Sequence, residues 1–167
     1  NQVIRIFAEC ISMGGNLLLD IGPKADGTIP GEQVAVLQGI GRWNKKHSEA
    51  IYGTGAGLPS GYFHGPSTLS ADSNMLYLFI AGNSGGQVML EGIKNKINRI
   101  YVVGNGTKLR WKEYLKPYWS SNSGVIFIDL PEAVTQGDLA EHGLHFHMVD
   151  AGIVGGEVYR HVRRAEY

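Results

Sequence analysis

A short apolar run near the start of the chain limits the possible folds most strongly. Leu17 to Leu19 and Ile21 follow Gly15 and precede Gly22-Pro23. A continuous apolar run with such borders is typical of a strand covered on both faces in a parallel sheet. Such a strand needs neighbours on both sides, which about 50 residues cannot supply. We therefore expect residues 1–54 to be the last unit of a (β/α)₈ barrel, or of an open α/β sheet, whose other units lie upstream.

A helix is predicted on each side of this run. Residues of the first stretch recur at helical spacing and form an apolar stripe that Gly14-Gly15 ends: Val3, Ile4, Phe7, Cys10 and Ile11. The second helix begins near Pro30, with Glu32 at its start and Lys45 and Lys46 at its end, as the helix dipole favours. Its expected buried stripe is Val34, Leu37, Ile40 and Trp43.

From about residue 68 the pattern changes to short runs of β-branched and aromatic residues separated by turn residues. The predicted strands are Met75 to Ala81, Gln87 to Leu90, Arg99 to Val103, Lys108 to Tyr114, Val125 to Leu130, Leu144 to Val149 and Glu157 to Val162. This number of short strands favours an all-β antiparallel sandwich over residues 68–167. Residues 55–67, rich in glycine and proline, are expected to be a linker over the surface.

Composition excludes several classes of protein. The chain has 167 residues, and 15 Lys and Arg balance 15 Asp and Glu, so no strong field favours nucleic acid or a membrane surface as a partner. With 43% hydrophobic residues it has enough apolar material for a packed core. The apolar runs are far shorter than the roughly 20 residues of a membrane-spanning helix. The single cysteine, Cys10, lies on the apolar stripe, which favours a buried, inert thiol.

Long ordered stretches of the first part resemble a known family. Gly14 to Pro30, Ile40-Gly41-Arg42-Trp43 and Glu49 to Thr54 are similar to the end of the catalytic domain in α-L-fucosidases of glycoside hydrolase family 29. The strand-rich part is similar to the C-terminal β-sandwich of that family in order and in two short phrases, Leu90 to Asn95 and Ile128 to Pro131. The resemblance therefore implies the end of a catalytic barrel followed by a β-sandwich.

The resemblance also implies an activity. It predicts a retaining hydrolase that removes terminal α-L-fucose from glycoconjugates or oligosaccharides with an Asp nucleophile and a carboxylic acid/base, and with no metal or organic cofactor. Retention requires two carboxyl groups roughly 5–5.5 Å apart. Both lie upstream of the matching stretch in the family, so no catalytic residue is assigned here. The family further implies a secreted, periplasmic or lysosomal location, and packing of this chain on the missing barrel portion or on a partner chain.

The candidates for substrate binding are Asp20, Lys24 and Trp119. Asp20 lies at the active-site end of the expected strand, although the family commonly has Asn there. Asp20 and Asp26 could form an acid/base pair, but a turn Asp before Gly27 is the favoured interpretation. Lys24 could face sugar or solvent.

Aromatic residues cluster in the second part and allow a second function. Trp111, Tyr114, Tyr118 and Trp119 could stack on pyranose rings, or they could fill the sandwich core together with Leu109 and Leu115. Tyr118 and Trp119 are the better candidates for exposure. The alternative function is thus a noncatalytic carbohydrate-binding or accessory module, or a subunit that completes a barrel. A self-sufficient module should bury Leu17 to Leu19, whereas a piece of a barrel should expose them.

Three further patterns have structural interpretations. His142, His145 and His147 share a strand spacing but have no third ligand of convincing spacing besides distant His161 or Asp150, so no metal site is expected. Gly53 to Gly57 follows a helix rather than preceding one, which favours a hinge over a phosphate loop. Arg160, His161, Arg163 and Arg164 are read as a solvated end, within a tail, Ala151 to Tyr167, whose role is unexplained.

Overall fold

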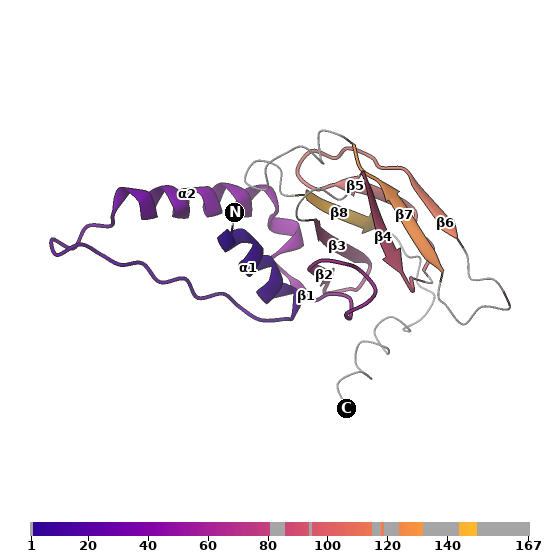
Figure 1. The fold of residues 1–167 in the computed structure, drawn as a ribbon, viewed down its shortest axis with the longest axis horizontal. Coiled ribbons are helices and arrows are strands. Elements are labelled where there is room, and N and C mark those ends of the chain that lie inside the picture. The colour runs from indigo at the N-terminus through magenta and orange to yellow at the C-terminus, as the bar shows by residue number, and fades with distance from the viewer. Residues whose placement is uncertain are drawn as a thin grey trace, which may run out of the picture.

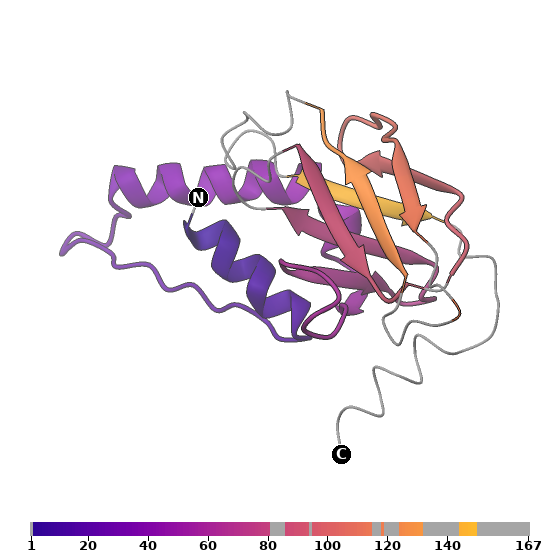
Figure 2. The same ribbon diagram turned by 45° about the vertical axis from the view of Figure 1, so that its right-hand side comes forward.

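The protein forms three layers in the computed structural model, which describes residues 2–80, 86–93, 95–114, 118, 124–131 and 144–149, the last stretch for its backbone. Helices α1 (Gln2–Ser12) and α2 (Gly31–Lys46) form the first layer (Figure 1). A five-stranded sheet lies in the middle. A three-stranded sheet covers its other face (Figure 2).

Both sheets are antiparallel throughout. The middle sheet has the order β1 (Thr54–Ala56), β2 (Ser67–Ser70), β3 (Met75–Ile80), β8 (Leu144–Val149), β5 (Arg99–Val102). The outer sheet has the order β4 (Gln87–Glu91), β7 (Val125–Asp129), β6 (Trp111–Tyr114). The prediction of antiparallel strands packed in two sheets is confirmed, with β6 shorter than expected. The strand predicted at Glu157 to Val162 lies outside the described residues.

Strand β3 explains how the layers are held together. Alternate side chains of a strand point to opposite faces. Leu76, Leu78 and Ile80 pack in the core between the two sheets, whereas Tyr77 and Phe79 pack against the helical layer. Each such buried apolar side chain contributes about 1.5–3 kcal/mol. Among the described residues, β3 is therefore a strand covered on both faces.

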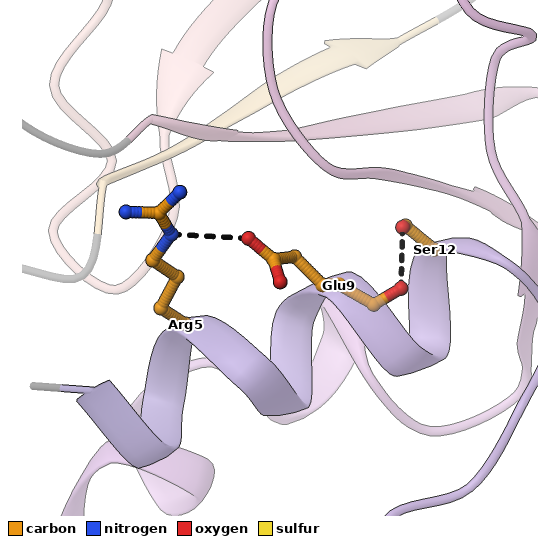
Figure 3. Close-up of polar contacts among 3 residues, drawn as sticks. All are labelled: Arg5, Glu9 and Ser12. Carbon is orange, nitrogen blue, oxygen red and sulfur yellow. Dashed lines mark hydrogen bonds and ion pairs between the residues drawn. The ribbon is translucent and has the colours of Figure 1, made fainter.

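Helix α1 ends as its two glycines predict. The amide of Gly14 donates to the carbonyl of Ile11 at 2.9 Å and that of Gly15 to Cys10 at 2.9 Å, which is a Schellman arrangement. Gly14 has a φ of 76°, which a residue with a side chain adopts only with strain. Figure 3 shows the solvent side of the helix, where Arg5 Nε lies 3.0 Å from Glu9 Oε1 and the hydroxyl of Ser12 donates to the carbonyl of Glu9. This exposed ion pair contributes less than about 1 kcal/mol.

The buried side chain of helix α2 lies near the C-terminal end of the helix. Trp43 is buried between Phe7 and Phe79, at ring distances of 6.2 and 6.4 Å. His47, just after the helix, is also fully buried, with Nδ1 2.9 Å from the carbonyl oxygen of Trp43. The rest of the expected stripe is not buried: Val34 and Ile40 are half-buried and Leu37 is exposed. The first turns of α2 extend beyond the sheet, as Figures 1 and 2 both show.

The run at Leu17 to Ile21 differs from its prediction. It forms no strand with any described residue, and Leu18 and Leu19 are 86% and 43% exposed. Its segment leaves α1, runs away from the sheets and turns back into α2 (Figure 1). The physical reason is the lack of neighbouring strands, because a strand without neighbours cannot pair its backbone groups. The exposure agrees with what we expect of a piece of a barrel.

The segment predicted to be a linker contributes to the middle sheet instead. Two residues of strand β1 and the first residue of β2 lie within the predicted linker, residues 55–67, and β1 pairs with β2. Gly57 is buried, and its amide donates to the carbonyl of Ser12 at 3.0 Å. A Cβ at Gly57 would overlap the carbonyl and hydroxyl oxygens of Ser67. Thr54–Ala56 therefore forms a strand and Gly57 a close backbone approach where a hinge was expected, which the glycines alone did not indicate.

Candidate functional site

The candidates Asp20 and Lys24 lie on the extended segment between α1 and α2. Both side chains are exposed, and neither forms an ion pair or a hydrogen bond with another described residue. The segment is fixed at two places. The side chain of Gln33 accepts from the amide of Gly22 at 3.0 Å, and the amides of Lys24 and Gly27 close a turn with Thr28 and Lys24. The structure therefore presents Asp20 and Lys24 to solvent beside exposed apolar side chains.

Asp26 belongs to the turn and not to a carboxylate pair. Its Oδ1 accepts from the amide and the hydroxyl of Thr28, at 2.9 and 2.7 Å. The hydroxyl bond, followed by the amide bond, holds the pKa of Asp26 below its usual value. A general acid near neutral pH needs a raised pKa. The turn interpretation of Asp26 is therefore supported.

A second candidate site lies beside strand β6, where a hollow of about 530 Å³ is lined by Leu109, Arg110, Trp111, Lys112 and Asp129. Leu109 is buried and Trp111 packs against the core between the sheets, whereas Arg110 and Lys112 are exposed. Sequence reasoning singled out Trp111 and missed the three charged residues. The alternation of Leu, Arg, Trp and Lys was the available signal, since it places both cations on the face away from the core.

The aromatic cluster divides between core and surface. Leu109 and Trp111 pack in the core, as the structural interpretation predicted, and the indole of Trp111 donates to Glu113 Oε1 at 2.9 Å. Tyr114 and Tyr118 are 58% and 99% exposed. The exposure expected for Tyr118 is confirmed. Trp119, the third substrate-binding candidate, and Leu115 lie outside the described residues.

The histidine pattern is described in part. His145 and His147 occupy alternate positions of β8, opposite Phe79 and Tyr77 of β3. His142, Asp150 and the basic end at Arg160 to Arg164 lie outside the described residues. Among the described residues, no group of three or more His, Cys, Asp or Glu side chains could hold a metal ion.

Cys10 is a free, half-buried thiol on α1. None of the described helices is both long and apolar enough to span a membrane.

Two tyrosines face the helical layer. Tyr77 is 4% exposed, and burial, together with the nearby charge of Glu49, raises its pKa to about 12. Burial also raises the pKa of Tyr101, which lies on β5 with the guanidinium of Arg99 5.3 Å from its ring centre. Both phenols therefore stay protonated at neutral pH and serve the packing of this layer.

Comparisons with known proteins show which proteins this chain is similar to. A family model described as "Alpha-L-fucosidase" matches residues 1–49. Plasma α-L-fucosidase of Homo sapiens is 30% identical over 137 residues, which are 78% of this chain and 28% of that protein. The α-L-fucosidase of Dictyostelium discoideum is 52% identical over 53 residues, which are 32% of this chain and 12% of that protein.

Solved structures extend the similarity to the β-sheets. α-L-Fucosidase isoenzyme 1 of Paenibacillus thiaminolyticus has a TM-score of 0.71 and 27% identity over 89% of this chain and 34% of its own. The α-L-fucosidase of Vibrio sp. strain EJY3 has a TM-score of 0.74 at 24% identity, again over 89% of this chain, which shows a shared fold. The class that this fold and sequence define is the glycoside hydrolases. The chain belongs to the α-L-fucosidase family and spans about a third or less of the length of these relatives.

Proposed function

We propose that this chain is the end of the catalytic barrel and the β-sandwich of a retaining α-L-fucosidase that removes terminal α-L-fucose from glycoconjugates or oligosaccharides. The observation that supports this most directly is that the family match and the exposed apolar side chains fall in the same segment. Residues 1–49 match the α-L-fucosidase family model, and the same residues carry most of the exposed apolar side chains of the described protein.

The exposed apolar surface indicates what this segment lacks. Its large side chains lie between residues 6 and 37, on α1, on α2 and on the segment between them: Ile6, Met13, Leu18, Leu19, Ile21, Ile29, Val36 and Leu37. A soluble monomer rarely exposes a large contiguous apolar patch without a partner. In the proposed parent the run at Leu17 to Ile21 pairs with neighbouring parallel strands, and the exposed faces of the helices pack on the rest of the barrel.

The chemistry of retention assigns a supporting role to this chain. Two carboxyl groups must lie roughly 5–5.5 Å apart across the scissile bond, one as nucleophile and one as acid/base. Asp26 is bound in its turn, and Asp20 is exposed without a carboxylate partner among the described residues. We therefore propose that both catalytic carboxylates come from the part of the parent outside this chain. Asp20 and Lys24, at the carboxyl end of the proposed strand, would then line the substrate side of the barrel.

A hybrid enzyme tests the proposal. The matching third of the Paenibacillus thiaminolyticus fucosidase is replaced by this chain, and hydrolysis of 4-nitrophenyl α-L-fucoside is measured for the hybrid, for the truncated enzyme and for this chain alone. We expect turnover from the hybrid and none from the two parts. A folded hybrid without turnover would show that this chain cannot complete the barrel. Turnover by this chain alone would place the catalytic pair within it and overturn the assignment of the carboxylates.

A further inference from the structure

The outward face of the three-stranded sheet carries an ordered set of side chains. Ile126 and Ile128 of β7 are buried, so the residues alternating with them, Val125, Phe127 and Asp129, lie on the opposite face. Strand pairing aligns these with residues of both neighbouring strands. The three rows across the sheet are Gln87, Asp129 and Arg110; Met89, Phe127 and Lys112; and Glu91, Val125 and Tyr114.

The centre of this face is apolar. Phe127 is half-buried, and Met89 and Tyr114 are 48% and 58% exposed. The rings of Tyr114 and Phe127 meet edge to face, with centres 5.6 Å apart and an angle of 86°. This contact orients Tyr114 while leaving much of the side chain accessible. The helical layer lies on the far side of the middle sheet and does not cover this face (Figures 1 and 2).

The rim of the face offers both hydrogen-bond donors and hydrogen-bond acceptors. Gln87 donates to Asp129 Oδ1 at 2.8 Å, which fixes that carboxylate and leaves its other oxygen as an acceptor. Arg110 and Lys112 are exposed, and their side chains form no ion pair or hydrogen bond with another described residue. Together with Asp129 they line the hollow of about 530 Å³ beside β6. This hollow is shallow and open to solvent.

We propose that this face is a binding site for a neutral oligosaccharide. A pyranose ring presents C–H groups on its faces and hydroxyl groups around its edge. The apolar side chains of Tyr114 and Phe127 can pack against the C–H faces of the ring. The donors and acceptors of Arg110, Lys112 and Asp129 can form hydrogen bonds with its hydroxyl groups. Equal numbers of acidic and basic residues on the face, Asp129 and Glu91 against Arg110 and Lys112, do not favour a strongly charged ligand.

This site is separate from the proposed catalytic one. It lies in the layer most distant from α1, α2 and the segment that holds Asp20, and its function does not rest on the proposed hydrolysis (Figure 1). In a fucosidase this site would hold a carbohydrate chain while the catalytic site removes fucose from the ends of that chain. Binding and turnover can therefore be tested independently.

Affinity electrophoresis of the full 167-residue chain tests the inference. The gels contain xyloglucan, galactan or xylan as neutral probes, polygalacturonate as an anionic probe, or no polysaccharide. We expect retardation by at least one neutral probe. The double variant K112A/Y114A should weaken that binding about tenfold, because it removes a charge-assisted hydrogen bond and a ring contact. The matched control, K45A/Y52A, removes an exposed lysine and an exposed tyrosine from the helical side. It should bind as the unchanged chain does.

Three results would overturn the inference. They are the absence of retardation by every neutral probe, an equal loss of binding in the two double variants, and retardation by polygalacturonate alone. Circular dichroism of both variants shows whether they are folded. If K112A/Y114A does not fold, the single variant K112A, which changes an exposed side chain, takes its place and should still weaken binding.

Discussion

At the residue scale, the protein keeps a protonated phenol between its helical layer and its middle sheet. Tyr77 is buried on β3, and burial first, then the charge of Glu49, raises its pKa to about 12 from 10. The folded state therefore holds this proton more tightly than the unfolded chain does. Stability from this difference is fully present below pH 10 and is lost as the pH rises toward 12.

The variant Y77F tests this coupling. A pKa raised from 10 to about 12 corresponds to about 2–3 kcal/mol. The free energy of unfolding of the unchanged chain should fall by about that much more than that of Y77F between pH 9 and pH 12, as measured by urea denaturation followed by fluorescence. The lysines and the other tyrosines titrate in both proteins. The difference between the two curves of unfolding free energy against pH therefore isolates the contribution of Tyr77. Parallel curves would contradict a raised pKa at this position.

At the element scale, the end of α1 and strands β1 and β2 form one joint. Gly57 donates to the carbonyl of Ser12 and lies against Ser67, whose hydroxyl accepts from the amide of Leu58 at 2.8 Å. Nearby, the buried hydroxyl of Thr68 donates to the carbonyl of Ala50 at 2.8 Å. These bonds connect the helical layer to the edge of the middle sheet.

The substitution G57A should separate this joint. Its methyl group would overlap the backbone of Ser67, so we expect a loss of about 3 kcal/mol or more in the free energy of unfolding. The control is G41A on the exposed side of α2, where an added Cβ meets no atom within 4 Å. It should stabilise the protein by about 0.5–1 kcal/mol, since alanine favours a helix interior. Equal effects of the two substitutions in chemical denaturation would argue against the close approach.

At the scale of the whole molecule, one end of the protein is packed and the other is open. The two sheets enclose a core that includes fully buried Leu78, Leu90 and Ile128, whereas the first turns of α2 and the segment before it reach beyond the sheets. Burial at the packed end is what stabilises the chain by itself. The open end gains its partners only in the proposed parent.

The variant L18D separates these two situations. Leu18 is 86% exposed in this chain, so the substitution should change the free energy of unfolding of the chain by less than about 0.5 kcal/mol. In the hybrid enzyme Leu18 would enter the barrel interior, where a buried, unpaired carboxylate is strongly destabilising, and fucosidase turnover should be lost. The control N98D adds the same charge at an exposed position outside the apolar surface and should leave turnover unchanged. Full turnover by the L18D hybrid would show that Leu18 does not enter the barrel.

The candidate site could be predicted only in part from the sequence. Residue spacing located Asp20, Lys24, Trp111 and Tyr114, but not that Arg110 and Asp129 lie across from each other on adjacent strands. That alignment depends on the register of β6 with β7, which is decided by which side chains enter the core.

Local chemistry determined the elements that form from their own residues. The spacing of Val3 to Ile11 with Gly14-Gly15, and the short β-branched runs after residue 68, predicted the first helix and the antiparallel strands because these signals are local. Only the tertiary structure decided which apolar run lies between two layers. Met75 to Ile80 has strands on both sides and packed layers on both faces, whereas the run at Leu17 to Ile21 pairs with no described strand. A strand is stabilised by the strands beside it, and its own sequence does not contain them.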